Sequence, residues 1–282
     1  MSRAPAPRPA AARRRRRTAL LMLGGAVVAS YFLAPFSWLI LTSIMSEQEA
    51  MAVPPHWIPD RPTLANYATF VNPTGTRSIV GSRAAENTLP AIRNSLVAAT
   101  GTAALNLALG TLAGYSFARV RFRGRPALLF LYLVIQRIGL LDSLLALVVT
   151  YLTFTLPFTI WLLKSYFQGI PREVEEAALV DGCTWPRMVQ RVLLPSAAPG
   201  LIAAAMFAFM TAWNDYLFAV ILTSSMAAKT APVVVAGFAT DVTTERTLMA
   251  AGGVLAVIPP LVLAFVFQRL IVQGLVSGAV KG

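Results

Sequence analysis

The sequence has one cysteine and one histidine among its 282 residues. Cys183 can therefore form no disulfide within the chain and no cysteine-based metal cluster. His56 stands alone between prolines in a short loop, so neither a catalytic role nor a metal site is assigned to it. The phosphate-binding pattern Gly-x-x-x-x-Gly-Lys-Ser/Thr is also absent, which excludes a P-loop ATPase activity of the chain itself.

Charged side chains are scarce as well. They make up 13% of the chain, against 56% hydrophobic residues and a mean hydropathy of +0.65. Soluble domains carry about 25% charged residues, so the composition predicts an all-α polytopic membrane protein. Apolar runs long enough to cross a hydrocarbon core of about 30 Å cover residues 18–45, 90–118, 143–167, 199–223 and 249–272, and a shorter run covers 126–136. In the second run, Gly110 and Gly114 form a small-xxx-small pair, which lets a neighbouring helix approach closely.

The charge that remains is mostly arginine, which accounts for 21 of the 24 basic residues in a chain of net charge +12. The arginines gather beside apolar runs, at 13–17, 119–125 and 172–191, and not on one amphipathic face, which argues against a nucleic-acid surface. Basic segments next to spans favour the cytoplasmic side. The chain is therefore predicted to be multi-pass in the cell membrane with both termini cytoplasmic, and residues 1–17 to form a disordered basic tail.

The polar segment 168–198 lies between two apolar runs and predicts an elbow of two short helices. Pro171 suits the first position of a helix, and the glutamates that follow suit its positive end. Gly182 can end this helix. A second helix is expected to begin between residues 184 and 186 and to end before Pro195.

The first elbow helix has a small apolar stripe of Val174, Ala177 and Ala178, with an acidic edge beside it, and such a face suits docking into a groove. It also carries a spaced motif: Glu176-Ala177-Ala178 is followed after three residues by Gly182, and then by Leu194-Pro195. This spacing resembles the EAA loop of importer-type ABC transporter permeases. Residues 62–67, 113–124 and 274–282 are similar to segments of the carbohydrate-importing branch that includes the maltose permeases.

The resemblance implies the transmembrane subunit of an ATP-driven sugar importer that works by alternating access, with no catalytic residue and no cofactor of its own. Its permease domain would be residues 18–282, with the coupling loop at 168–198. In that family the elbow seats in a cleft of the cytoplasmic ATPase, and the C-terminal tail of the maltose-transporter member reaches the ATPase dimer interface. ATPase-coupling roles are thereby implied for Glu175, Glu176, Ala177, Ala178, Asp181, Gly182, Val280, Lys281 and Gly282.

The resemblance also implies the partners and the helix count. The partners are a second, homologous permease subunit in a heterodimer, an ABC ATPase dimer, an extracytoplasmic sugar-binding protein and membrane lipid. The family fold is a six-helix bundle, but the region before Asp142 is shorter than the family pattern by roughly 15–20 residues, about one half-span or more. This deficit predicts a shortened third helix and tight turn over 126–142, with Arg137 and Asp142 reaching towards water or each other. A deletion in the gene would also explain the missing residues. The fourth helix is expected over 143–167, with a bend near Pro157.

The fifth apolar run contains Trp213-Asn214-Asp215-Tyr216, which places an amide and a carboxylate in an otherwise apolar helix. An acidic residue at a helix centre costs roughly 2.5–3.5 kcal/mol or more in lipid, so such residues usually face a bundle interior or a wet path. We expect these four residues to line the substrate pathway. A helix–helix hydrogen bond or a hydrated mouth is the alternative.

Other function classes stay open. An ion-coupled secondary transporter would need midplane ionisable residues or paired broken helices in repeated halves, and the sequence offers only Asp215 and no inverted repeat. A membrane enzyme with Glu175 and Glu176 as acid and base is disfavoured, because consecutive helical residues point in different directions. A permease for a non-sugar solute such as glycerol phosphate is a further alternative. Co-purification of an ATPase would separate the permeases from the other two classes.

The arginine pattern predicts that the elbow faces the cytoplasm. Because Cys183 is the only cysteine, a membrane-impermeant thiol reagent should leave the protein unlabelled in intact cells. The same reagent should label it after the membrane is permeabilised, which serves as the control. Labelling from outside in intact cells would mean that the topology is inverted.

Overall fold

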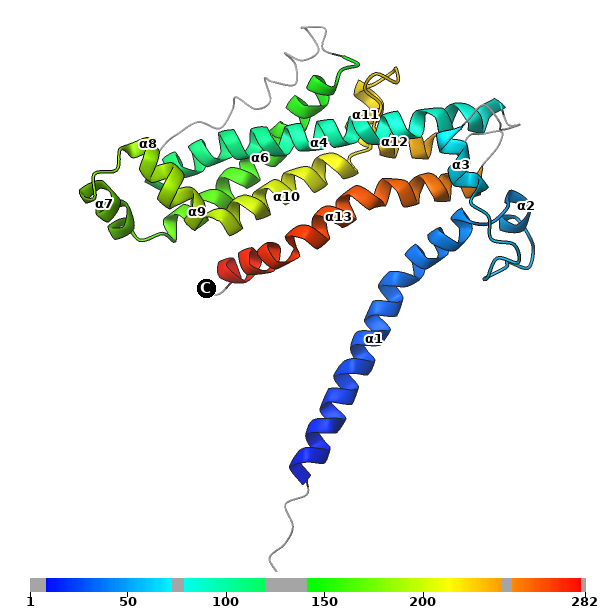
Figure 1. Ribbon diagram of the computed structural model, residues 1–282, viewed down its shortest axis with the longest axis horizontal. Helices are drawn as coiled ribbons and strands as arrows, with labels where there is room; N and C mark the ends of the chain where they lie inside the picture. Colours follow the sequence, from blue (N-terminus) through cyan, green and yellow to red (C-terminus); the bar gives the residue numbers. More distant parts are fainter. Residues whose placement is uncertain (1–8, 73–78, 120–140, 240–244, 280–282) are drawn as a thin grey trace, which may run out of the picture.

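The computed structural model describes residues 9–72, 79–119, 141–239 and 245–279, and its elements within these ranges are helices. They are α1 (Pro9–Ser43), α2 (Glu47–Ala50), α3 (Ala65–Val71), α4 (Ile79–Arg119), α6 (Leu144–Gln168), α7 (Arg172–Val180), α8 (Trp185–Met188), the π-helical turn η2 (Val189–Leu193), α9 (Leu194–Ser196), α10 (Ala198–Asn214), α11 (Leu217–Leu222), α12 (Ala231–Ala236) and α13 (Arg246–Ala279). In Figure 1, α4, α6, α10 and α13 lie along one another as a bundle. Helix α1 meets this bundle at one end and then diverges from it (Figure 1).

Four of these helices are long and apolar enough to cross a membrane. The apolar stretches are Arg16–Ser43 of α1, Ala84–Ser116 of α4, Leu144–Gln168 of α6 and Arg246–Gln268 of α13. A fifth span results if Trp185–Ser196 and α10, which are bent by 76° against each other, count as one. The described residues thus form an all-helical membrane protein with four or five candidate spans, which confirms the coarse fold class.

The bounds of α6 agree with those predicted from the sequence, whereas α1 begins earlier than predicted. Helix α6 begins after the capping hydroxyl of Ser143 and runs through Pro157 to Gln168, close to the predicted range 143–167. Helix α1 begins at Pro9, so residues 9–17, which the sequence assigned to a disordered tail, are helical. Alanine and arginine fill that stretch and are among the best helix formers, which accounts for the earlier start. The bend expected at Pro157 stays a prediction, and residues 120–140, which hold most of the expected short third helix, lie outside the described residues.

Helices α4 and α6 pack closely at the predicted glycine pair. A Cβ on Gly114 would lie 3.0 Å from the Cβ of Leu163 and 3.2 Å from the backbone nitrogen of Lys164, so the backbone of α6 passes directly over this glycine. A Cβ on Gly110 would meet the side chain of Thr159. The prediction that Gly110 and Gly114 allow a close helix approach is confirmed.

A buried polar contact lies in the same interface. Asn106 of α4 is fully buried, and its side-chain amide donates to Oγ1 of Thr155, which donates in turn to the carbonyl of Tyr151 at 2.8 Å. Hydrogen bonds between spans contribute on average about 0.6 kcal/mol. Together with the glycines, this bond fixes the rotation of α6 against α4.

The contacts between α4 and α6 advance in the same direction along both helices. Gly101 of α4 faces Val148, Asn106 bonds Thr155, and Gly114 faces Leu163. The two helices are therefore parallel neighbours.

Buried apolar side chains of the described residues form three clusters, and two of them pack between α4, α6 and α10. One lies beside α11 and contains Ala98, Ala99, Leu147, Val148, Tyr151, Leu152, Phe209, Ala212, Trp213, Ala219 and Leu222. The other, called the elbow cluster below, contains Leu163, Phe167, Ala178, Met188, Leu193, Ala197 and Ala204. The elbow cluster brings α7 and α8 into the core, so the polar segment between the spans is anchored on the bundle.

The fifth apolar run, predicted as one span over 199–223, is interrupted. Helix α10 ends at Asn214, Asp215 is extended with φ −71° and ψ 127°, and α11 begins two residues later. The Asp215 carboxylate accepts the backbone N–H of Ala219 at 3.0 Å. Aspartate in this position caps a new helix in place of the carbonyl that a continuous helix would use. The prediction of one unbroken helix is wrong for this reason.

Replacing Gly114 with alanine should destabilise the protein, because the added Cβ would meet backbone that cannot move aside. We expect a loss of about 1–3 kcal/mol from overpacking, measured as a lower melting temperature in detergent. Gly101→Ala is the matched control on the same pair of helices, since its Cβ would lie 3.4 Å from a methyl of Val148, an ordinary contact. Equal melting temperatures for the two variants would contradict the close approach at Gly114.

Candidate functional site

The first elbow helix, α7, is closed at both ends by its local sequence. Pro171 is the residue before the helix, with φ −58° and ψ 141°, and is not the first helical residue that the sequence suggested. At the other end Gly182 donates to the carbonyl of Leu179, and Cys183 donates to the carbonyl of Ala178, each at 3.0 Å, which is a Schellman cap. Gly182 has φ +83°, a conformation that favours glycine. The prediction that Gly182 ends the helix is confirmed.

The second arm of the elbow continues through Pro195. Helix α8 starts at Trp185, as expected, and leads through the π-helical turn η2 into α9, which contains the proline. The wider turn leaves Pro195 at the start of a new helical segment, where its missing N–H is not needed. The expected end before Pro195 is therefore wrong, because helical periodicity in the sequence does not reveal a π turn. The arm then bends by 76° into α10.

One side of the elbow is packed on the bundle. Ala178 of α7 is buried, as are Met188 and Leu193 of the second arm. They meet Leu163 and Phe167 of α6 in the elbow cluster. The elbow is therefore packed on the end of α6.

The other side of the elbow is exposed, and the residues with implied coupling roles divide between the two sides. Glu176, Ala177, Asp181 and Gly182 are exposed, Glu175 is half-buried, Ala178 is buried, and Val280, Lys281 and Gly282 lie outside the described residues. The predicted stripe is thus split, since Val174 and Ala177 face out while Ala178 faces in. Glu175 accepts a hydrogen bond at 3.2 Å from the hydroxyl of Tyr115 on α4. Its carboxylate is therefore turned towards the bundle.

Three apolar side chains on the exposed side were not expected. Leu179, Val180 and Trp185 are 48%, 87% and 51% exposed. A helix as short as α7 buries only one side, so the Leu-Val pair directly after the two alanines was the signal available in the sequence. Exposed apolar groups next to carboxylates suit a groove in a partner protein.

The four residues expected to line a pathway have different environments at the break between α10 and α11. Trp213 is buried in the cluster beside α11, whereas Asn214 and Tyr216 are exposed. Asp215 is half-buried, and its Oδ2 accepts the hydroxyl of Tyr151 on α6 at 3.1 Å as well as the backbone N–H that caps α11. This is the helix–helix hydrogen bond that the sequence left open as the alternative. Within the quartet, Asn214 and Tyr216 keep accessible side chains.

Asp142 fastens the start of α6 to the loop after α11. It has φ +61°, and its N–H donates to the carbonyl of Leu222 at 2.8 Å. Its Oδ1 accepts the backbone N–H groups of Ser224 and Ser225, each at 2.9 Å. Hydrogen bonds from Ser225 and then Ser224 hold the pKa of Asp142 below its ordinary value. The expected contact with Arg137 concerns a residue outside the described ranges.

The same loop, residues 223–230 and called the rim loop below, is also fastened to α4. The side-chain amide of Asn94 donates to the carbonyls of Met226 and Lys229, each at 3.1 Å. The backbone N–H of Ala231 donates to the hydroxyl of Ser95 at 2.7 Å. The rim loop is thus held between the two parallel helices, far along them from the elbow cluster.

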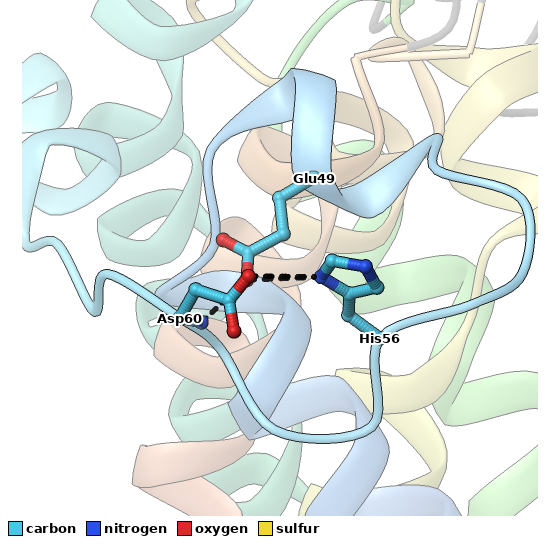
Figure 2. A group of neighbouring side chains, drawn as sticks. All are labelled: Glu49, His56 and Asp60. Atoms are coloured by element: carbon cyan, nitrogen blue, oxygen red, sulfur yellow. Dashed lines mark hydrogen bonds and ion pairs between the residues drawn. The ribbon is translucent and has the colours of Figure 1, made fainter.

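A group of metal-ligand side chains lies in the loop after α2. Figure 2 shows the carboxylates of Glu49 and Asp60 converging on Nδ1 of His56, at 3.8 and 3.3 Å, and the three ligand atoms lie within 4.8 Å of one another. Such a spacing fits a divalent cation, but contacts within the protein already account for it. Glu49 accepts the backbone N–H of Asp60 at 2.6 Å, and both carboxylates lie within ion-pair distance of the His56 ring. The group therefore fastens the loop onto α2.

Comparisons with known proteins all find similarity to one family of transport proteins. Residues 120–277 match the profile described as binding-protein-dependent transport system inner membrane component. The inner membrane ABC transporter permease protein YcjP of Escherichia coli (strain K12) is 35% identical over 267 residues, 89% of this chain and 91% of YcjP. The trehalose transport system permease protein SugB of Mycobacterium tuberculosis (strain CDC 1551 / Oshkosh) is 35% identical over 275 residues, 91% of this chain and 95% of SugB. A chain from a bacterial ABC transporter involved in the import of the acidic polysaccharide alginate has a similar fold, with a TM-score of 0.73 at 19% identity, covering 95% of this chain and 100% of that one.

Removing the Asp142 carboxylate should loosen the rim loop. Asp142→Asn keeps a side-chain acceptor oxygen and tolerates the positive φ. Asp142→Gly tolerates the positive φ but has no acceptor, and Asp142→Ala has no acceptor and is strained at this φ. We expect melting temperatures in detergent to fall in that order. In the wild type, this stabilisation is present above about pH 4 and is lost as the pH falls through the lowered pKa of the folded protein. Wild-type melting temperatures for all three variants would contradict the role of this carboxylate.

Proposed function

The chain belongs to the family of binding-protein-dependent transport system inner membrane components, and from this premise we propose that it is the permease subunit of an ATP-driven importer of a mono- or oligosaccharide. ATP hydrolysis in such a system resides in a separate subunit, in keeping with the missing phosphate loop. The relative SugB, named as a trehalose permease, supports a sugar as the substrate.

The observation that carries the proposal is the two-sided elbow. Its inner side is buried in the elbow cluster through Ala178, and its outer side presents Val180 beside the Glu176 carboxylate. An isolated solvated loop would have no reason to bury one side in the core of the bundle. An exposed apolar group next to an acidic edge is what a groove in an ATPase subunit could bind.

The proposed cycle is mechanical. ATP binding closes the ATPase dimer, which pushes on the outer side of the elbow. The elbow joins the end of α6 to the start of α10, so both spans receive the push. The spans then rock, and the sugar pathway opens to one side of the membrane at a time. No bond to the sugar is made or broken.

We infer that a second, homologous permease subunit completes the assembly and contacts α1. Within an 18-residue apolar part of α1 no side chain is buried, and the helix diverges from the bundle (Figure 1). A helix that is apolar on all sides needs lipid or protein around it. An arm of this kind can hold a partner permease at a distance that leaves a pathway between them. The sugar-binding protein would deliver its cargo from outside, and residues 280–282 would reach the ATPase.

We propose a six-helix permease bundle with a shortened third helix. Helices α4 and α6 are parallel, so the chain between them, residues 120–143, has to return from one end of the bundle to the other. A crossing made within so few residues is necessarily short, which agrees with the deficit seen in the sequence. With an odd number of crossings before α6, the ends of α4 and α6, the elbow and both termini would share one side of the membrane, and the arginines beside them favour the cytoplasmic side.

Within the expected pathway residues, we propose that Asn214 and Tyr216 meet the sugar. Their side chains are exposed, and a pathway wall made of an amide and a phenol can hydrogen-bond sugar hydroxyls. Trp213 and Asp215 would support the helix break from inside. Asp215 does not support the ion-coupled alternative as a site for the coupling ion, because its carboxylate already accepts two hydrogen bonds from the protein.

Two elbow variants test the proposal. Glu176→Lys reverses a charge on the exposed side, and Gly182→Pro is incompatible with the positive φ that ends α7. Both should abolish sugar uptake and the stimulation of ATP hydrolysis by the loaded binding protein, while the protein stays inserted in the membrane. Uptake by cells and ATPase activity of the purified complex are the measurements.

The matched control for the charge reversal is Glu86→Lys, at an exposed position on α4 far from the elbow. It should leave uptake and ATPase stimulation near the wild-type level. Wild-type uptake and stimulation in both elbow variants would disprove the coupling role. Failure of any ATPase to co-purify with the wild-type chain would point to the ion-coupled class.

A further inference from the structure

Tyr115 of α4 touches three other helices at the elbow end of the bundle. Its ring packs edge-on against Phe167 of α6, with centroids 5.7 Å apart at 89°. It also meets Trp185 of α8, with centroids 5.6 Å apart at 64°. Its hydroxyl donates to Oε2 of Glu175 on α7 at 3.2 Å. One side chain therefore connects a span to both arms of the elbow and to the helix on which the elbow is seated.

The position of Tyr115 on α4 is fixed by its neighbour. Gly114 lies directly against the backbone of α6 at Leu163 and Lys164, so α4 cannot slide or rotate here without a clash. Tyr115 itself is half-buried and packs against the elbow cluster. The phenol is thus a rigid group held at a known place, and its oxygen points at α7.

The chain itself does not join the elbow directly to α4. The elbow follows α6 and precedes α10, so these two spans receive its movement through the backbone. Apolar packing alone has no preferred direction, whereas a hydrogen bond to a carboxylate does. The contact between Tyr115 and Glu175 is a directional link from α7 to α4.

We propose that Tyr115 is a positioning residue that couples the movement of the elbow to α4, by holding Glu175 through its hydroxyl and Trp185 through its ring. This inference rests on the proposed role of the elbow as the ATPase contact. Loss of the hydroxyl would let α7 move without α4. The ATPase would then still turn over, but with less sugar moved for each ATP hydrolysed.

The test uses the complete complex in proteoliposomes with its ATPase and binding protein. Tyr115→Phe keeps the ring and both aromatic contacts and removes only the hydroxyl, so the melting temperature should stay close to that of the wild type. The number of sugars moved per ATP should fall by about two- to thirtyfold, the range for mutations that modulate coupling. If Tyr115 were merely structural, its substitution would lower the melting temperature and leave the number of sugars moved per ATP unchanged.

Variants of Glu175, the hydrogen-bond partner, and of Ser116, a neighbour on α4, complete the experiment. Glu175→Gln should lower the same ratio, and the double variant Tyr115→Phe/Glu175→Gln should be no worse than the poorer single variant, because both remove one link. Ser116→Ala is the matched control on α4, since its hydroxyl donates to the carbonyl of Leu112 in its own helix. It should leave the ratio at the wild-type value.

Two outcomes would overturn the inference and leave the proposed function standing. One is a wild-type ratio in Tyr115→Phe while Glu176→Lys abolishes uptake. The other is a double variant whose loss is the product of the two single losses, since the two groups would then act separately. If Glu176→Lys and Gly182→Pro transport normally, the proposed function itself is wrong. Failure of the proposed function is thereby distinguished from failure of the inference on Tyr115.

Discussion

The close parallel packing of α4 on α6 is the constraint on which the rest of the molecule depends. Without side chains at Gly110 and Gly114, the two backbones can approach at the elbow end, and the buried bond from Asn106 to Thr155 fixes their rotation. In lipid there is little hydrophobic drive between helices, so such fitted contacts and buried hydrogen bonds decide the arrangement. The register set there determines which groups of the two helices meet at either end of the bundle.

Each end of this helix pair is used differently. At one end, the fixed register brings Tyr115 beside Phe167 and creates the seat for the elbow. At the other, Asp142 and Asn94 hold the rim loop between the two helices. At the rim loop these side chains bind backbone groups, whereas at the elbow end the contacts join side chains to one another. The α4–α6 pair is thus held by contacts at both of its ends.

The sequence revealed what depends on local pattern and missed what depends on distant contacts. Length and hydropathy located the spans, the small-residue spacing located the helix contact, and Gly182 marked a helix end. The break at Asp215 was missed because hydropathy continues through it, and only the bonds to Tyr151 and Ala219 reveal it. The π turn before Pro195 leaves no periodic signal. Asp142 was expected to reach towards water or Arg137, since the loop residues that it binds, 82 and 83 residues away, cannot be seen in the local sequence.

A photo-crosslinking amino acid at Val180 measures the central claim, that the exposed side of the elbow meets an ATPase subunit. Val180 is 87% exposed on α7, and Val53, 94% exposed in the loop after α2, gives a comparison site of the same residue type. Irradiation of membranes that hold the complete transporter should give an adduct with the ATPase from residue 180 and none from residue 53. An ATPase adduct from residue 53, or none from residue 180 in a complex that transports sugar, would contradict the account.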